Sequence, residues 1–302
     1  MRTHIQIMRC LCFAIFTSIA AVSFTSHSQT GQRRTTLAIL NFGDSVLGRE
    51  VPQKLAANLK QGGLIVLDHD QVAAAARGIG YTGSINLSVN EARDLGAALG
   101  CDFFILGDAQ VLRLSPSEGP IYFESYASTF TVSARTGRLV KWQRTKFRAS
   151  TAAVAEQALM SELSSTELRD RLISSIRSAE ATERSERELT FDQQTPIIEI
   201  APDDETRAEA EGLQLPRPYR RLSPAYPGTA ADAEAEGTVD VLVDLDAAGE
   251  VLRVTVARWA GFGLDETTVD TVRRLHFFPA MRSGVAVPIR VLLRYNFRKP
   301  PR

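Results

Sequence analysis

The sequence predicts a secreted two-domain protein: an α/β domain, then a smaller α+β domain whose β-β-α-β order forms a three-stranded antiparallel sheet. Three observations lead to this fold class. A length of 302 residues suits two domains of ordinary size. Apolar runs and helical patterns alternate over residues 36–178, and residues 287–298 have a period of two, with one apolar and one mostly cationic face. The apolar content of 44% allows each domain to build a core, and the net charge of zero gives no general case for nucleic acid as a partner.

The first 28 residues are predicted to be a signal peptide. Basic residues up to Arg9 precede a charge-free apolar run, Leu11–Phe24, and small residues follow up to Ser28. Cleavage after Ser28 would export the chain. The alternative is an uncleaved anchor over residues 5–24, which would hold Arg9 inside the bilayer at a cost of about 2.5–3.5 kcal/mol.

The α/β domain is expected to span residues 36–178. Its strands are predicted from short, continuously apolar runs, and its helices from four-residue apolar spacing, capping residues and terminal glycines. In chain order we expect a strand at 37–42, a helix from Gly48 to Gly62, a strand at 64–67, a helix at 71–77 capped by Asp68 or Asp70, a helix with a capping box at Ser88 and Glu91, a strand at 103–106, a hairpin of 122–133 with 139–147, and helices at 152–160 and 166–178.

Two motifs in this domain do not support a cofactor or a metal. The segment Gly78–Gly83 matches G-x-G-x-x-G, but it follows a predicted helix, whereas a dinucleotide site needs a strand before the motif and a helix after it. The segment Asp68–Asp70 holds three metal-type side chains, yet consecutive residues rarely converge on one ion. We therefore predict no cofactor and no metal site.

Catalytic side chains are scarce once the signal is removed. His69 and His276 are then the remaining histidines, and Cys101 is the remaining cysteine, so no intramolecular disulfide forms. Cys101 is expected to be a small buried hydrophobe at the start of a strand. No catalytic residue is predicted.

The order of elements over residues 36–178 resembles a known envelope domain. The resemblance lies in the segments Leu37–Phe42, Val66–Asp68, Leu95–Gly107 and Thr136–Gly137. It is similar to the α/β domain shared by the TolB amino-terminal domain, the curli-secretion protein CsgG and lipoproteins that activate penicillin-binding proteins. This resemblance implies a binding or assembly module and not an enzyme.

Residues 179–214 are predicted to be an acidic linker, because they carry eleven acidic residues, three arginines and scattered prolines. Residues 179–189 are compatible with a short extension of the preceding helix. The linker is either a plain spacer or an acidic tether that transiently covers the basic end of the chain.

Residues 215–302 form the predicted second domain. Its inward side chains are expected at Val239, Val241, Val243 and Leu245 on one strand, and at Leu252, Val254 and Val256 on the next. The expected elements are an extended start, a short helix at 230–236, strands at 237–246 and 251–257, a helix capped by Asp265 and ending at Leu275, and the final strand at 287–298.

The final strand has one apolar and one mostly cationic face. Ile289, Val291, Leu293 and Tyr295 alternate with Arg290, Leu292 and Arg294, and Pro288 is typical of a strand start or a sheet edge. A cationic edge strand either keeps other edges away or docks an extended partner strand.

A set of residues spread over this domain forms a recognisable pattern: Tyr226, Pro227, Gly237, Gly249, Asp265, Phe278, Pro279, Ala280 and Gly284. With these residues the domain resembles the carboxyl-terminal domain of the TonB family. In that family, the domain lies in the periplasm and takes up an extended peptide of an outer-membrane transporter by strand addition. It also transmits force from a proton-driven motor in the inner membrane.

By position, the resemblance implies a partner-binding edge on the final strand. Backbone groups would supply the hydrogen bonds, and Arg290 and Arg294 would set the charge preference. The edge comprises Ile289, Arg290, Val291, Leu292, Leu293, Arg294 and Tyr295.

The sequence departs from the energy-transducer pattern in three ways: a signal predicted to be cleaved, an acidic linker poor in proline, and an interposed α/β domain. The first hypothesis is therefore a periplasmic protein that docks a peptide from an outer-membrane transporter or another envelope protein. An inner-membrane motor would be a partner only if the amino terminus stays uncleaved, which would make the chain an anchored energy transducer. The second hypothesis is an envelope assembly or scaffold factor in which the first domain acts and the second localises it.

No nucleic acid is expected as a partner, even though residues 273–302 carry eight basic and no acidic residues.

Overall fold

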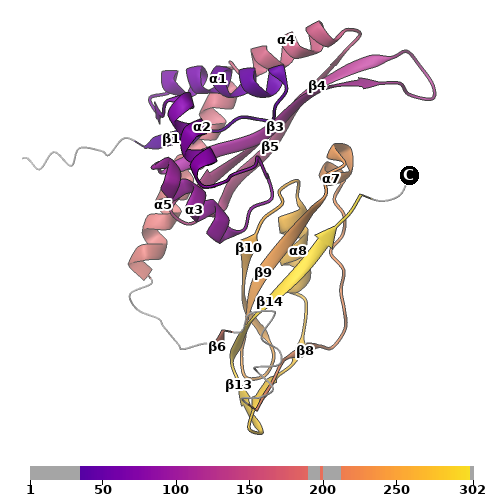
Figure 1. Ribbon diagram of the computed structural model, residues 1–302. Coiled ribbons are helices and arrows are strands. Elements are labelled where there is room, and N and C mark those ends of the chain that lie inside the picture. The colour runs from indigo at the N-terminus through magenta and orange to yellow at the C-terminus, as the bar shows by residue number, and fades with distance from the viewer. Residues whose placement is uncertain (1–34, 190–197, 200–211, 300–302) are drawn as a thin grey trace, which may run out of the picture. The chain divides into compact units, whose positions relative to one another are not determined.

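Two β-sheets organise the part of the chain that the computed structural model describes, residues 35–189, 198–199 and 212–299 (Figure 1). The predicted signal peptide lies outside these residues, and so do most of the positions of the predicted linker after residue 189. Among the described residues, no helix combines the length and the apolar character needed to cross a membrane.

The first sheet has five strands in the order β2-β1-β3-β4-β5. β1 pairs in parallel with β2 and β3, whereas β3, β4 and β5 are antiparallel neighbours. The predicted hairpin joins β4 to β5, and Gly137 in its turn has a φ of 69°. The strands are β1 (Thr36–Ile39), β2 (Ile65–Val66), β3 (Phe103–Leu114), β4 (Tyr122–Ser133) and β5 (Leu139–Ala149).

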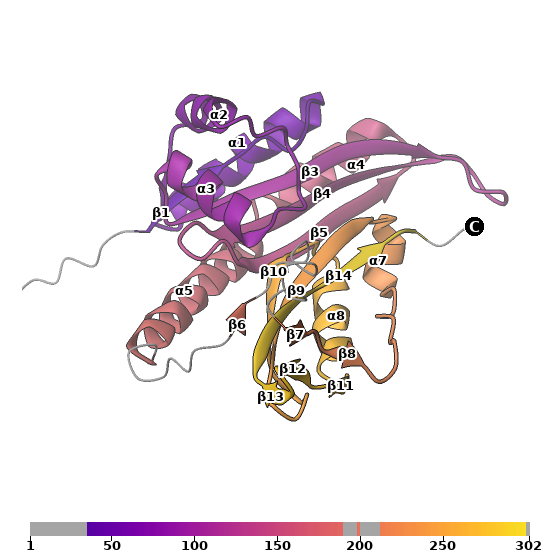
Figure 2. The same ribbon diagram turned by 60° about the horizontal axis from the view of Figure 1, so that its bottom comes forward.

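Helices lie on both faces of this sheet (Figure 2). Consecutive strand side chains point to opposite faces, so Leu37 and Ile39 belong to one hydrophobic cluster and Ala38 and Leu40 to the other. Three helices supply the first cluster: α1 (Val46–Gln61), α4 (Ala152–Glu162) and α5 (Thr166–Leu189). Two helices supply the second: α2 (His69–Gly78) and α3 (Val89–Leu99).

Local sequence signals predicted several helix ends correctly. The Ser88 hydroxyl accepts a hydrogen bond from the Glu91 backbone N–H, and the Glu91 carboxylate accepts one from the Ser88 N–H, which completes the predicted capping box. Asp68 caps α2, and Gly100 ends α3 in the left-handed conformation.

Two predicted strands differ in length from the structure. β2 is a two-residue edge strand, and Ile65 is exposed, because a strand at the end of the sheet has a neighbour on one side only. β3 continues to Leu114 because β4 pairs with it over its whole length. α5 continues past residue 178 to Leu189, as the extension considered for residues 179–189 allowed.

The second sheet has the order β10-β9-β14-β6. Its first three strands form the predicted antiparallel sheet, and α8 adds Leu264 and Val272 to its core. The fourth strand, β6, was not predicted and comes from the linker. The elements are β6 (Ile198–Glu199), β9 (Gly237–Leu245), β10 (Val251–Arg258), α8 (Leu264–Val272) and β14 (Ile289–Phe297).

The prediction that Leu252 faces inward was wrong. Pairing between β10 and β9 shifts between Val251 and Arg253, so this irregularity changes the alternation. Leu252 is 65% exposed, while Val251, Val254 and Val256 pack against the core. Shorter elements complete the domain: β7 (Leu213–Gln214), β8 (Arg217–Pro218), α7 (Gly228–Ala233), β11 (Phe277–Phe278), β12 (Ala280–Arg282) and β13 (Val285–Val287).

Aromatic side chains from the two sheets pack together, and Arg34–Arg302 is one compact unit. The Phe130 ring of β4 lies 5.8 Å from the Trp259 ring and 5.5 Å from the Phe262 ring, measured between centroids. Trp142 of β5 also contacts Phe262. A Cβ at Gly261 would lie 2.5 Å from the Phe130 ring, so glycine is needed for this close approach.

Asn86 adds polar contacts to the same interface. Its amide nitrogen donates to the carbonyl oxygens of Thr238 and Trp259, and its amide oxygen accepts from the Thr238 N–H. Arg258 forms ion pairs with Glu91 of α3 and with Asp240 of β9. The α/β domain is thus joined to the second sheet by a shared apolar core and by the polar contacts of Asn86 and Arg258.

Candidate functional site

β14 carries the predicted docking edge and is paired unequally on its two sides. It pairs with β9 at all nine positions from Ile289 to Phe297. On its other side it pairs in parallel with β6 at two positions, Ile289 with Ile198 and Arg290 with Glu199. From Val291 to Phe297, no strand of the described residues lies against this outer edge.

The inner face of β14 is part of the core. Ile289 and Phe297 are buried, and Val291, Leu293 and Tyr295 pack against the hydrophobic cluster. Burial raises the pKa of the Tyr295 hydroxyl. This alternation agrees with the orientation predicted from the sequence, and it determines which side chains of β14 remain on the outer face.

The outer face of β14 forms ion pairs with β9. The Arg290 guanidinium donates two hydrogen bonds to the Asp244 carboxylate, at 2.5 and 3.0 Å. The Arg294 guanidinium donates two to the Asp240 carboxylate, at 2.7 and 3.0 Å. Two-point pairs of this kind restrict the orientation of both side chains. Leu292 lies between the arginines, opposite Leu242 of β9.

β10 supplies a second arginine to each aspartate. Arg253 lies 4.0 Å from the Asp244 carboxylate, and Arg258 lies 3.4 Å from the Asp240 carboxylate. Both aspartates are nearly covered, with 4% and 5% of their surface exposed. Two rows of Arg-Asp-Arg therefore cross the outer face of the sheet, and with Glu91, which also pairs with Arg258, three carboxylates of the described residues face four arginines.

The residues that carry the family resemblance are structural supports around this sheet. The Tyr226 hydroxyl donates to the Ala235 carbonyl oxygen at 2.6 Å, and Pro227 precedes α7 at its N-cap position. Gly237 begins β9, where an added Cβ would lie 2.9 Å from the Ala260 Cβ. These contacts hold the start of β9 against the loop that follows β10.

The remaining residues of the pattern lie near the turns at the other end of the domain. Gly249 has a φ of 86°, and an added Cβ would meet the Phe277 carbonyl oxygen at 2.0 Å and approach the Pro279 nitrogen. Ala280 is buried, and Gly284 adopts a φ of 81° in the turn between β12 and β13. Phe278 is 59% exposed and packs against the Tyr219 ring.

The expected helix-capping role of Asp265 was wrong. The N-cap residue of α8 is Gly263, and Asp265 lies in the first helical turn. Its carboxylate accepts hydrogen bonds from the backbone N–H groups of Ala260 and Gly261, so it holds the loop before the helix. Burial raises the pKa of this carboxyl to about 7, although the two hydrogen bonds act in the opposite direction.

A protein-family model described as the carboxyl-terminal region of the Gram-negative bacterial TonB protein matches residues 223–298. Residues 223–298 form a TonB carboxyl-terminal domain. The match contains β9, β10, α8 and β14, and therefore the whole of the antiparallel sheet described above.

Solved structures were also compared with the chain. The carboxyl-terminal domain of Pseudomonas aeruginosa TonB is 23% identical and covers 29% of this chain and 89% of its own, with a TM-score of 0.25. Lipoprotein GNA1162 of Neisseria meningitidis is 16% identical and covers 49% and 99%, with a TM-score of 0.31. A PelC dodecamer of Paraburkholderia phytofirmans is 12% identical and covers 43% and 83%, with a TM-score of 0.25. A search of curated proteins found no match.

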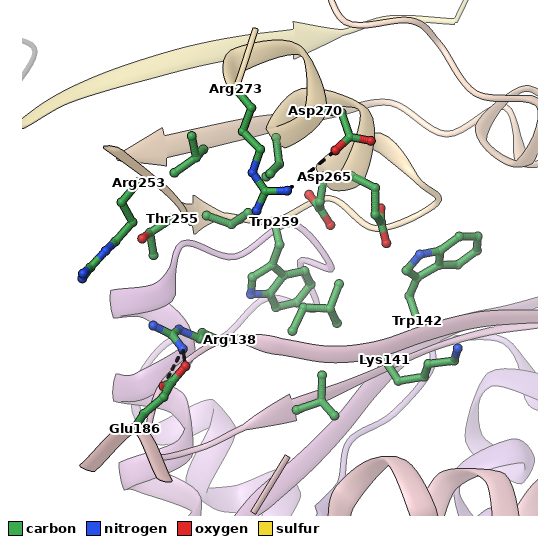
Figure 3. A pocket seen from close by; sticks show the side chains of 16 residues that line it. Arg138, Lys141, Trp142, Glu186, Arg253, Thr255, Trp259, Asp265, Asp270 and Arg273 are labelled. Carbon is green, nitrogen blue, oxygen red and sulfur yellow. Dashed lines mark hydrogen bonds and ion pairs between the residues drawn. The ribbon is translucent and has the colours of Figure 1, made fainter. Parts of the chain in front are cut away.

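A cleft lies beside the TonB domain, between β10 and α8 on one side and β5 and the end of α5 on the other (Figure 3). Its volume is about 1200 Å³, and both tryptophans of the chain line it. Arg138 pairs with Glu186 at 2.8 Å, and Arg273 approaches Asp270 at 4.0 Å. The described lining residues include no histidine, cysteine or serine, but they include the carboxylates of Glu186, Asp265, Glu266 and Asp270.

The two motifs that the sequence analysis rejected as metal or cofactor sites, Asp68–Asp70 and Gly78–Gly83, lie at the two ends of α2. Asp68 accepts hydrogen bonds from the N–H groups of Asp70 and Gln71. Gly78 ends α2, and the next helix begins at Val89, so no helix follows the glycine motif directly. Within the described ranges, no three His, Cys, Asp or Glu side chains converge as metal ligands would.

Sequence reasoning missed the two aspartates of β9. Their alternation placed them on the outer face, but their arginine partners lie on other strands, and only the register brings them together. Trp259 and Asn86 were also missed, because a contact between the two domains leaves no periodic signal in either one.

Proposed function

We propose that this protein is a periplasmic TonB-family binding protein that captures an extended peptide by β-strand addition. The peptide would come from an outer-membrane transporter or another envelope protein, and it would pair with β14 between Ile289 and Tyr295. The observation that carries the proposal is the unequal pairing of β14, which is complete toward β9 and, among the described residues, involves two positions on the outer side. An edge with unpaired backbone groups is a template for another strand.

The ion pairs across the sheet support this role. A strand that accepts a peptide must keep its own conformation, because ordering the template on binding would cost affinity. Arg290 and Arg294 are held by Asp244 and Asp240, which reduces the freedom of β14. The excess of arginine on this face favours a peptide with acidic side chains.

A binding role fits the domain better than catalysis. The TonB carboxyl-terminal domain belongs to a family of protein-interaction domains, which is the basis for proposing that the chain is not an enzyme. Export through the predicted signal would bring it to the periplasm, and mass spectrometry of the exported protein is expected to find Gln29 as its first residue. An intact amino terminus in the inner membrane would instead favour an energy transducer that works with a membrane motor.

A scaffold role is the second candidate, and one observation favours it. Phe130 of the α/β domain packs against Trp259 and Phe262 of the TonB domain, so a partner held by one domain would be placed against the other. The α/β domain would then act on envelope assembly, and the TonB domain would localise it. Crosslinking through the α/β domain to cell-wall synthases or secretion components, retained after β14 is blocked, would favour this alternative.

The docking proposal can be tested by peptide binding to the full-length protein. The probes are synthetic peptides that span the periplasmic amino-terminal segments of outer-membrane transporters from the same genome. Fluorescence anisotropy is expected to show saturable binding of at least one peptide. Two derivatives of that peptide, N-methylated at alternating sets of residues, separate the two sides of its backbone. One derivative should lose binding and the other should keep it, because alternate N–H groups of a strand point to opposite sides.

Variants of β14 provide the matching test on the protein. Because consecutive N–H groups alternate, either Val291 or Leu292 directs its N–H to the outer edge and the other directs it to β9. Proline at the outward position should abolish binding in a folded protein, and proline at the inward position should unfold the sheet. Unimpaired binding by whichever of the Val291→Pro and Leu292→Pro variants is well folded would rule out docking on this edge.

A further inference from the structure

The chain supplies a strand to its own docking edge. β6, residues Ile198–Glu199, comes from the acidic stretch between α5 and the TonB domain, and it lies parallel to β14. It is far in sequence from the three strands of the predicted sheet, yet it occupies the position next to β14 in the sheet order. Figures 1 and 2 both show β6 beside the start of β14.

The position of β6 overlaps the edge proposed for the partner. β6 pairs with Ile289 and Arg290, and these are the first two residues of the proposed docking edge, Ile289 to Tyr295. Alternate residues of β14 direct their backbone N–H and C=O groups to the outer edge, and one strand at a time can lie against these groups, so two strands cannot pair with the same section at once. A peptide that uses the whole edge must therefore replace β6.

The section of β14 beyond Arg290 offers a partner peptide a site for its first backbone pairing. Beyond Arg290, no strand within the described ranges lies against β14. A peptide can pair first along this section and then advance toward Ile289 as β6 leaves. Among the described residues, two residue pairs join β6 to β14, so the backbone contacts to be exchanged there are few.

We infer that β6 is an intrachain competitor that covers the start of the docking edge, and that a partner peptide binds fully only by displacing it. This inference rests on the proposed function, and it adds regulation of the same site. Because the competitor is tethered to the edge, its local concentration is high even though each contact is weak. Weak or short peptides would be rejected, and peptides that pair along the whole edge would be accepted.

The test compares two double variants of the full-length protein. Ile198→Pro with Glu199→Pro removes both backbone N–H groups of β6, and therefore the one that faces β14. Ile198→Thr with Glu199→Gln is the matched control, because it keeps both N–H groups and a β-branched side chain while it removes the charge. The proline variant is expected to bind the transporter peptide about tenfold more tightly than the unmodified protein, and the control variant to bind as the unmodified protein does.

Hydrogen exchange gives a readout that needs no peptide. The amides of Ile289 to Val291 that face β6 are expected to exchange faster in the proline variant and at the original rate in the control. Equal peptide affinity for the proline variant and the unmodified protein would overturn the competition, and so would an equal gain in affinity by both variants. Absence of peptide binding by all three proteins would instead refute the proposed function, and the inference with it.

Discussion

The indole nitrogen of Trp259 donates a hydrogen bond to the carbonyl oxygen of Gly137 at 3.2 Å, and this bond joins the TonB domain to the turn between β4 and β5. Trp259 is 1% exposed, and its ring stacks on Phe130. A buried indole N–H needs a partner, and here the partner belongs to the other domain. The two domains therefore share one of their largest buried side chains.

Removal of this side chain should separate the domains. Trp259→Ala is expected to lower the free energy of unfolding by about 3–5 kcal/mol, because it leaves a cavity and an unpaired carbonyl group. We also expect urea unfolding, followed by circular dichroism, to change from one transition to two. Trp259→Phe is the control: it keeps ring contacts, loses the hydrogen bond, and should cost about 1–2 kcal/mol. An unchanged single transition in Trp259→Ala would show that Trp259 does not couple the domains.

The aspartates of β9 should matter more than surface charges do. Asp240→Ala is expected to lower the free energy of unfolding by about 2 kcal/mol. This is less than for a fully buried pair, because the side chains of Arg294 and Arg258 are 56% and 24% exposed and are partly hydrated. Asp270→Ala, at a carboxylate that is 71% exposed, is the control and should change stability by less than about 0.5 kcal/mol. Equal effects in urea titrations of the two variants would contradict this account.

Two glycines with positive φ angles form a matched pair. A Cβ at Gly137 (φ 69°) would lie 2.0 Å from the Val89 carbonyl oxygen, whereas a Cβ at Gly83 (φ 90°) would meet no atom within 4 Å. Gly83→Ala should therefore cost only backbone strain of about 1 kcal/mol. Gly137→Ala should cost several times as much, and it should also disturb the hydrogen bond to Trp259. Thermal unfolding of both variants measures the difference, and equal losses would argue against the close packing of this turn on α3.

Asp265 should make stability depend on pH. Its pKa is raised by burial to about 7 in the folded protein, above the value of 3.8 expected without burial. Between these two values the folded state binds the proton and the unfolded state does not, so the free energy of unfolding should fall as pH rises from about 4 to 7. The slope is at most about 1.4 kcal/mol per pH unit. Urea titrations at pH 5 and 7 measure it, and the difference between them should shrink in Asp265→Asn. The same slope in that variant would assign the dependence to another group.

The sequence was sufficient for elements whose signals are local. The capping box at Ser88 and Glu91, and the alternation of β14, each depend on residues within one segment, and both are present in the structure. Predictions from the sequence were wrong where contacts with residues of other segments determine the orientation or the role of a side chain. Leu252 faces outward because the register between β10 and β9 shifts beside it, and Asp265 binds the preceding loop because that loop packs against Phe130.

In the candidate site, too, some features could be predicted from the local sequence and others depend on tertiary contacts. Alternation and the family pattern were enough to single out β14 as the candidate docking strand, with one apolar and one mostly cationic face. The ion pairs of Arg290 and Arg294, the contact of Trp259 with Gly137 and the pairing of β6 were decided by the tertiary structure. Each of them joins residues that lie far apart in the chain. Periodicity reports which face of a strand is buried, but it carries no information about which strand, loop or domain will lie against it.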